Sequence, residues 1–122
     1  MPYLKIQTAT VGGQLSAAGS SADSTQAFLK KASRLVAQEL GKPEQYVMVS
    51  LAPTSAMLFA GSAEPAAFLE LRAIGLPAAR TGDLARVLCE LVESQLGVPK
   101  DRVFINFVDV PANLWGWNGE TF

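Results

Sequence analysis

The chain has 122 residues, of which 49% are hydrophobic and 17% charged, and its ten basic and eleven acidic residues give a formal charge of −1. This length favours one domain over residues 1–122. Because there is no basic stripe or basic tail, we expect no nucleic-acid partner. The absence of histidine excludes histidine-based acid–base catalysis and histidine-ligated metal, and the single Cys89 cannot form an internal disulfide.

The charged share is low against a typical ~25%, and this has two interpretations. The chain either has a large core or buries apolar surface between the subunits of an oligomer. The N-terminus lacks the basic region and apolar run of a signal peptide, and no stretch approaches the ~18 apolar residues of a membrane helix. We therefore expect no membrane partner and a cytoplasmic location, unless the protein leaves the cell by an unconventional route.

The first half of the chain predicts a strand, a loop and a helix. Leu4 and Ile6 alternate with polar neighbours, which is typical of a half-buried strand. The stretch from Val11 to Asp23 is rich in glycine, serine and alanine and predicts a flexible loop. A helix is expected from about Ser24 to Leu40. Its apolar stripe consists of Phe28, Ala32, Leu35, Val36 and Leu40.

The second half repeats this arrangement without the long loop. Leu69 and Leu71 alternate with charged neighbours and predict a strand. Thr81 is a suitable N-cap for a helix that runs from about Gly82 to Leu96. The apolar face of this helix consists of Leu84, Val87, Leu88, Leu91 and Val92.

An internal repeat supports this division. Residues 35–51 and 91–107 align at one constant offset, with identical leucine, valine, leucine, glycine, proline and valine. In each copy a glycine can cap the helix, a proline prevents its continuation, and an apolar strand follows, at Val47–Leu51 and Val103–Val108. The prediction is an α+β, β-α-β-β-α-β subunit with a pseudo-two-fold and a four-stranded sheet with two helices on one face. Since the other face would be bare and the last strand is apolar on both sides, we expect an oligomer.

The tail from Pro111 to Phe122 contains Trp115, Trp117 and Phe122 in a stretch broken by glycine and asparagine. These aromatic residues are expected to pack on a neighbour, either as an interface or as a pocket wall. The common nucleophile, phosphate-binding and metal-ligand motifs do not occur. We therefore expect neither a metal nor a cofactor.

The unusual feature that remains is Pro2. Removal of Met1 is favoured by a small second residue, and it would leave a secondary amine at the start of a buried strand. A free α-amine titrates near ~7.7–8.0, and burial or a nearby ammonium lowers that pKa. A base is most useful when its pKa is near the working pH, so a terminal proline could serve as a general base. The alternative is that Pro2 has no chemical role.

Several segments together carry a family resemblance. They are Met1-Pro2-Tyr3-Leu4, Gly41–Tyr46, Gly61–Pro65, Ala73-Ile74-Gly75, Asp101–Phe107 and Gly116–Phe122. The chain resembles the macrophage migration inhibitory factor family nearly from end to end, with Val11–Asp23 as an apparent insertion. The resemblance implies a homotrimer whose sheets form a central barrel. It also implies a cofactor-independent isomerase, a keto–enol tautomerase of the phenylpyruvate or dopachrome type, with its sites between subunits.

The resemblance also implies roles for single residues. Pro2 would be the base, Lys42 would hold the carboxylate of a small aromatic keto acid, and Ile74 would offer backbone hydrogen bonds and an apolar wall. Asn106 would reach in from the next subunit, beside Phe104, which stands where the family has a tyrosine. The aromatic side of the pocket would be Trp115, which replaces a small apolar family residue, with Trp117 and Phe122.

Other interpretations stay open. Lys42 could simply stabilise a helix C-terminus, and Asn106 could satisfy neighbouring backbone groups. The family's Cys-x-x-Cys stands here as residues 66–69, Ala-Ala-Phe-Leu, so thiol–disulfide activity is not implied. The alternative function is a cytokine-like signalling or interaction protein with a vestigial tautomerase pocket and an unidentified receptor. A third is a trimer with only a structural role.

Overall fold

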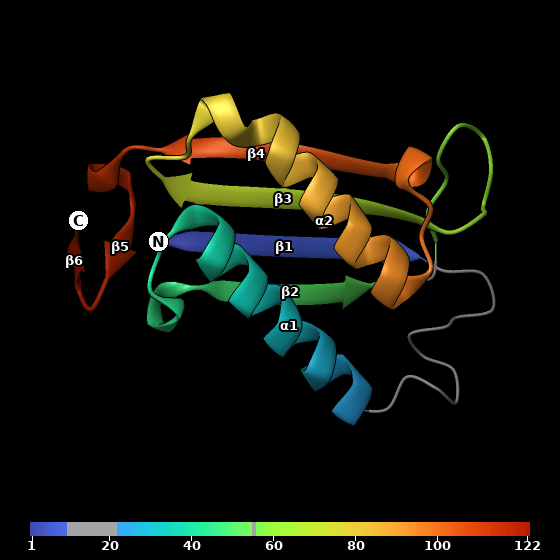
Figure 1. Cartoon of the computed structure of the whole chain (residues 1–122), viewed down its shortest axis with the longest axis horizontal. Coiled ribbons are helices and arrows are strands. Elements are labelled where there is room, and N and C mark those ends of the chain that lie inside the picture. Colours follow the sequence, from blue (N-terminus) through green and yellow to red (C-terminus); the bar gives the residue numbers. More distant parts are fainter. Residues whose placement is uncertain (10–21, 55) are drawn as a thin grey trace.

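The computed structural model describes residues 1–9, 22–54 and 56–122. The two predicted β-α-β units are confirmed, and a small C-terminal hairpin follows them (Figure 1). Short 3-10 turns occupy Glu44–Tyr46, Ala78–Arg80, Lys100–Arg102 and Ala112–Leu114. The main elements are β1 (Pro2–Ala9), α1 (Ala22–Leu40), β2 (Met48–Pro53), β3 (Ala66–Ile74), α2 (Thr81–Leu96), β4 (Val103–Val110), β5 (Gly116–Trp117) and β6 (Glu120–Thr121).

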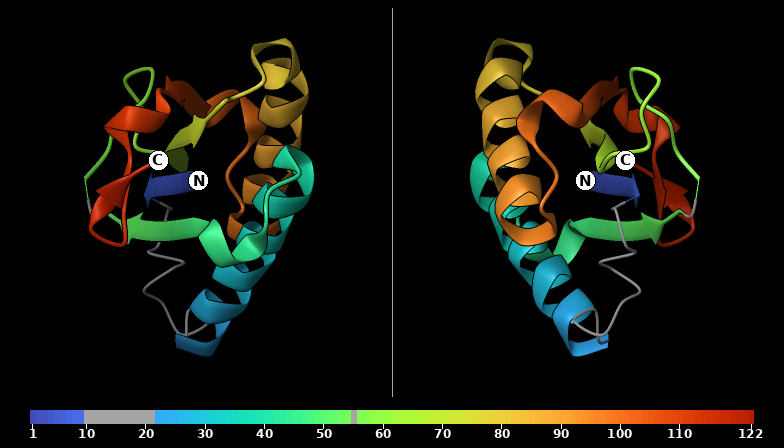
Figure 2. Two further views of the ribbon diagram at one scale, coloured as in Figure 1. Left: turned by 90° about the vertical axis from the view of Figure 1, so that its left-hand side faces the viewer. Right: turned by 90° about the vertical axis from the view of Figure 1, so that its right-hand side faces the viewer.

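The four-stranded sheet has the order β2-β1-β3-β4. β1 pairs in parallel with β2, β3 pairs in parallel with β4, and the antiparallel pair β1–β3 joins the two units at the centre. Each parallel pair therefore belongs to one copy of the sequence repeat, with its helix as the crossover. Figure 2 shows both helices on one side of the sheet and the C-terminal hairpin on the other side.

The core lies between the helices and the sheet. Leu4 and Ile6 of β1 and Leu69 of β3 are completely buried, which confirms the period-2 prediction for these strands. Removing such a side chain from water contributes roughly 1.5–3 kcal/mol to stability. The helices contribute the buried residues Phe28, Ala32, Val36, Leu84, Leu88, Leu91 and Val92.

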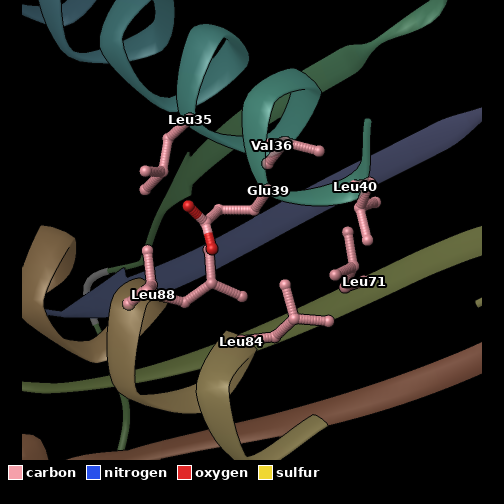
Figure 3. Close-up of a pocket in the computed structure, with 8 residues that line it drawn as sticks. Leu35, Val36, Glu39, Leu40, Leu71, Leu84 and Leu88 are labelled. Atoms are coloured by element: carbon pink, nitrogen blue, oxygen red, sulfur yellow. The ribbon is translucent and has the colours of Figure 1, made fainter. Parts of the chain in front are cut away.

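The facing sides of the two helices enclose one small cavity and also border a wider, open groove. Figure 3 shows Leu35, Glu39 and Leu84 around a cavity of about 10 Å³ between α1, α2 and β3. This volume is close to that of one water molecule, and the lining is mostly leucine and valine. This cavity is too small for an organic ligand, whereas an open groove of about 410 Å³ also lies between α1 and α2, with Lys31, Gln38 and Glu90 in its lining.

The face of the sheet opposite the helices is mixed in character. Met48, Phe68 and Phe104 are exposed on it, at 65%, 41% and 58% of their surface. Between them β1 presents Lys5, and β3 presents its partner Glu70. The prediction of apolar strands on both faces is correct for the aromatic part of this surface, but the central rows are polar.

Some boundaries differ from the predictions. Asp23, expected in a loop, lies in the first turn of α1, where an acidic side chain is favoured by the helix dipole. Ala22, also expected in the loop, begins α1, and residues 11–21 of the predicted insertion fall outside the described residues. The prediction of Thr81 as an N-cap is wrong because the helix begins at Thr81 itself, after Arg80. The Thr81 hydroxyl instead donates to the Ala78 carbonyl at 3.1 Å, within the preceding turn.

Candidate active site

Pro2 begins β1 and lies opposite Ala73 of β3, with less than 2% of its surface exposed. A hollow of about 300 Å³ opens beside it. That volume is at the lower end of the range for small-molecule sites. Its walls come from three segments that are far apart in the sequence: residues 1–3, 45–48 and 115–117. In Figure 1 these segments meet at the left-hand end of the sheet, where the N-terminus and β5 lie.

The second wall depends on how the chain returns from α1 to β2. Gly41 ends the helix with a φ of +62°, a conformation that favours glycine. Pro43 follows in an extended conformation, and the Tyr46 amide donates to its carbonyl at 3.1 Å. The resulting 3-10 turn places Tyr46 and Val47 against the N-terminus.

The third wall is the C-terminal hairpin of β5 and β6. Asn118 and Gly119 form its two-residue turn with φ values of +55° and +80°, as expected for a type I′ turn. The Phe122 amide donates to the carbonyl of Trp115 at 3.2 Å, which fixes the end of the chain to the start of the hairpin. The hairpin therefore places Trp115 and Trp117 on the hollow.

Aromatic contacts connect this wall to the second one. The rings of Trp117 and Phe122 stack at 5.9 Å with an interplanar angle of 15°. Trp117 also meets Tyr46 edge-on, with the ring centroids 5.5 Å apart. Of the three aromatic residues predicted for the pocket, Trp115 and Trp117 line the hollow and Phe122 packs behind Trp117.

Lys42 lies close enough to the N-terminus to affect its charge. Burial lowers the pKa of the Met1 amino group, and the positive charge of Lys42 lowers it further. Lys42 follows Gly41 directly, and its amide donates to the Ala37 carbonyl at 3.0 Å, at the C-terminus of α1. The ammonium is therefore placed both for the helix dipole and for the amine end of β1.

Ile74 is near the hollow but is not part of its wall. It ends β3 one residue after Ala73, the partner of Pro2, and pairs with Val110 of β4. Its side chain is half-buried.

The structure does not bring Asn106 and Phe104 to the Pro2 hollow of the same chain. They lie on β4 opposite Glu70 and Phe68, and β3 separates β4 from β1. Phe104 pairs with Phe68, five residues before Ala73, the partner of Pro2, which corresponds to roughly 16 Å along the strands. Two strand spacings add about 10 Å across the sheet. In a single chain these two residues cannot reach an amine at Pro2.

Comparisons with known proteins decide the family. The family model described as macrophage migration inhibitory factor matches residues 1–122. The chain belongs to this family. It is 39% identical to a macrophage migration inhibitory factor homolog of Brugia malayi, over 100% of this chain and 99% of the relative. It is also 38% identical to the macrophage migration inhibitory factor of Rattus norvegicus, over 80% of this chain and 85% of the relative.

Solved structures of the macrophage migration inhibitory factor family have the same fold. The homologue from Prochlorococcus marinus is 41% identical, with a TM-score of 0.85 and coverage of 98% of both chains. The factor from Trichinella spiralis is 33% identical, with a TM-score of 0.84 and coverage of 98% of this chain and 99% of that one. The predicted fold class and the predicted family are therefore confirmed.

Beyond Met1, six residues of the hollow in this family member are not predicted from the sequence: Tyr3, Gln45, Tyr46, Val47, Met48 and Gly116. Gln45 and Tyr46 belong to the same segment, Gly41–Tyr46, as the predicted site residue Lys42. Their closeness to Lys42 in the sequence is the signal that could have indicated a place at the pocket. The Tyr3 hydroxyl forms a hydrogen bond of 2.7 Å with Ser50 Oγ on the neighbouring strand. This contact orients the ring that forms one side of the hollow.

Other chemistries find little support in the described residues of this chain. They contain no group of three or more acidic or cysteine side chains arranged to hold a metal ion. Across the same residues, neither helix has the length and apolar character needed to span a bilayer. Cys89 is half-buried, and burial raises the pKa of its thiol; Lys100 lowers it and Glu93 raises it to a smaller extent.

Proposed function

We propose that this family member is a cofactor-independent keto–enol tautomerase that acts on a small aromatic α-keto acid. The catalytic base is the secondary amine of Pro2, which becomes available when Met1 is removed. The observation that carries this proposal is the position of the N-terminus, at a hollow with aromatic walls and within the electrostatic influence of Lys42. We further propose that residues 1–122 form one domain located in the cytoplasm.

The reaction moves one proton between carbon and oxygen. Neutral Pro2 takes a proton from the carbon beside the ketone, the carbon–hydrogen bond breaks, and its electron pair forms the carbon–carbon double bond of the enolate. The enolate oxygen then accepts a proton, and the amine loses one, so that the base is regenerated. Lys42 offsets the charge of the substrate carboxylate, and donors aimed at the enolate oxygen lower the barrier.

The surroundings of the N-terminus favour a neutral amine. Burial and the charge of Lys42 both lower the pKa of the Met1 amino group, and a Pro2 amine would lie close to the same position. An amine whose pKa is lowered is neutral, and able to accept a proton, over a wider range of pH. A histidine is therefore not needed for this chemistry.

We propose a homotrimer in which the next subunit completes each site with Phe104 and Asn106. Two observations support it: both residues are distant from Pro2 in their own chain, and both are exposed on the uncovered sheet face. The exposed Met48, Phe68 and Phe104 on that face are large apolar side chains that association would remove from water.

A second candidate is a signalling protein, because the relatives are named for an effect on macrophage migration. In that case the pocket would be a relic or a binding site for a receptor or ligand. Turnover of phenylpyruvate separates the two candidates. The proposed enzyme shows turnover that depends on a free Pro2 amine, whereas a signalling protein with a vestigial pocket shows none.

A further inference from the structure

The loop between β2 and β3 ends in a tight turn. Phe59 and Ser62 exchange two backbone hydrogen bonds, each of 3.0 Å, across Ala60 and Gly61. Both central residues have positive φ values, +54° and +74°, and alanine adopts this conformation rarely. Contacts from outside the turn are therefore expected to hold its shape.

Arg102 supplies those contacts from the turn before β4. Its Nε donates to the Pro65 carbonyl at 2.8 Å, and its Nη1 donates to the Phe59 carbonyl at 3.1 Å. Its Nη2 donates to the carbonyls of Ser62 and Glu64, both at 3.0 Å. The guanidinium carbon also lies 5.2 Å from the centre of the Phe59 ring. One side chain thus binds the loop at four carbonyls and one ring.

The loop in turn supports an exposed aromatic residue. The Phe59 ring contacts the Phe104 ring, with centroids 4.6 Å apart at an angle of 56°. Phe104 keeps 58% of its surface exposed, next to Phe68 on the uncovered sheet face. Figure 2 places the loop on this side of the sheet, opposite the helices.

We propose that Arg102 is a positioning residue for substrate specificity. By holding the loop it keeps Phe59 against Phe104, and so fixes the aromatic wall that one subunit presents to the Pro2 site of a second copy. The inference rests on the proposed tautomerase site between subunits and adds to it two residues, Arg102 and Phe59. Their effect is on recognition of the substrate ring and not on proton transfer.

This role has a distinct kinetic signature. A wall that contacts the ring, away from the reacting carbon, binds substrate and transition state equally, so its loss raises KM and leaves kcat unchanged. A keto acid with an aliphatic side chain makes little use of such a wall. A defect in folding or assembly would instead reduce activity on both kinds of substrate.

The test compares Arg102→Lys, Phe59→Leu and the unchanged chain, all processed to Pro2 and checked as trimers by sedimentation. Lysine keeps the positive charge but cannot form four directed hydrogen bonds from a planar fork. The control is Arg86→Lys, since Arg86 forms an exposed ion pair with Glu90, at 3.6 Å, on the far helix α2. Turnover is measured with phenylpyruvate and with an aliphatic α-keto acid.

Both variants are expected to raise KM for phenylpyruvate on the order of tenfold, because small misplacements of binding groups are costly. Their KM for the aliphatic acid, their kcat and the control should stay unchanged. Equal losses on both substrates, a loss confined to kcat, no loss, or dissociation of the Arg102→Lys trimer would each overturn the proposal. Absence of turnover in the unchanged chain would overturn the proposed function with it, whereas normal turnover with unaffected variants overturns only this inference.

Discussion

Trp117 meets Tyr46 edge-on, with ring centroids 5.5 Å apart and an interplanar angle of 84°. This contact joins the C-terminal hairpin to the turn that precedes β2, and both segments line the hollow beside Pro2. Trp117 connects two walls of the pocket through its contact with Tyr46, and Phe122 stacks on the same indole from within the C-terminal segment. The aromatic side of the site is therefore held together largely by one side chain.

Replacing Trp117 should consequently open the pocket. In Trp117→Ala the contacts with Tyr46 and Phe122 are both lost, and each such pair contributes about 0.5–1.5 kcal/mol beyond its buried area. We expect KM for phenylpyruvate to rise by roughly tenfold or more. Trp117→Phe is the matched control and should retain most of the affinity. Identical KM values in the alanine variant and the unchanged chain would show that the hairpin is not a pocket wall.

Lys42 should matter more for turnover than for folding. Lys42→Ala removes a helix-end charge that contributes only about 0.3–1 kcal/mol to stability, but it also removes the proposed partner of the substrate carboxylate. We expect kcat/KM for phenylpyruvate to fall while the melting temperature changes little. Lys31→Ala, at an exposed position on α1, is the control for loss of one positive charge. A lowered melting temperature with unchanged kcat/KM would assign Lys42 to the helix terminus alone.

The same variant should shift the pH dependence. The charge of Lys42 lowers the pKa of the Met1 amino group, after the larger effect of burial, and we expect the same two effects on a Pro2 amine. Activity that needs a neutral amine rises with pH through that pKa and then reaches a plateau. In Lys42→Ala the amine is easier to protonate, so the rise should move to higher pH. A shift to lower pH, or a profile without any rise, would contradict a basic amine next to Lys42.

Cys89 should be unreactive in the folded protein. Burial raises the pKa of its thiol, so little thiolate is present near neutral pH. We expect slow alkylation by iodoacetamide under native conditions and fast alkylation in denaturant. We also expect no catalytic reduction of insulin disulfides. Reductase turnover that disappears in Cys89→Ser would disprove this.

Much of the fold could be predicted from the sequence because its signals are local and occur twice. Gly41 and Gly97 end the helices, with φ values of +62° and +73°, and prolines two residues later lead into the strands that follow. The start of α2 was misplaced by one residue because threonine suits both the N-cap and the first turn. The C-terminal hairpin was missed because its strands have only two residues each.

The site was less predictable than the fold. Pro2, Trp115 and Trp117 are predicted for the pocket from the sequence and line the hollow. Tyr3 and Met48 line it too but are not predicted, since each resembles an ordinary strand residue. Their place on the hollow depends on which strands are neighbours, and the order β2-β1-β3-β4 has no local signal in the sequence. The Arg102 contacts likewise depend on loop residues that lie 40 and 43 positions earlier in the chain.

The oligomeric state is a separate test of the intersubunit site. Phe104 and Asn106 can complete a Pro2 site only if a second subunit covers the open sheet face. We expect sedimentation at micromolar concentration to give the mass of three chains. A stable monomer that retains full phenylpyruvate turnover would contradict a site shared between subunits.

The most direct test of the central claim compares two samples of the unchanged sequence, one processed to Pro2 and one with Met1 retained, each verified by mass spectrometry. An amide nitrogen at Pro2 has no available lone pair, so only the processed sample has the base. Fold and sedimentation should be the same in both. We expect the Met1-retained sample to be slower on phenylpyruvate by the contribution of a general base, typically 10²–10⁴-fold. Equal rates in the two samples would remove Pro2 from the mechanism and favour the signalling protein.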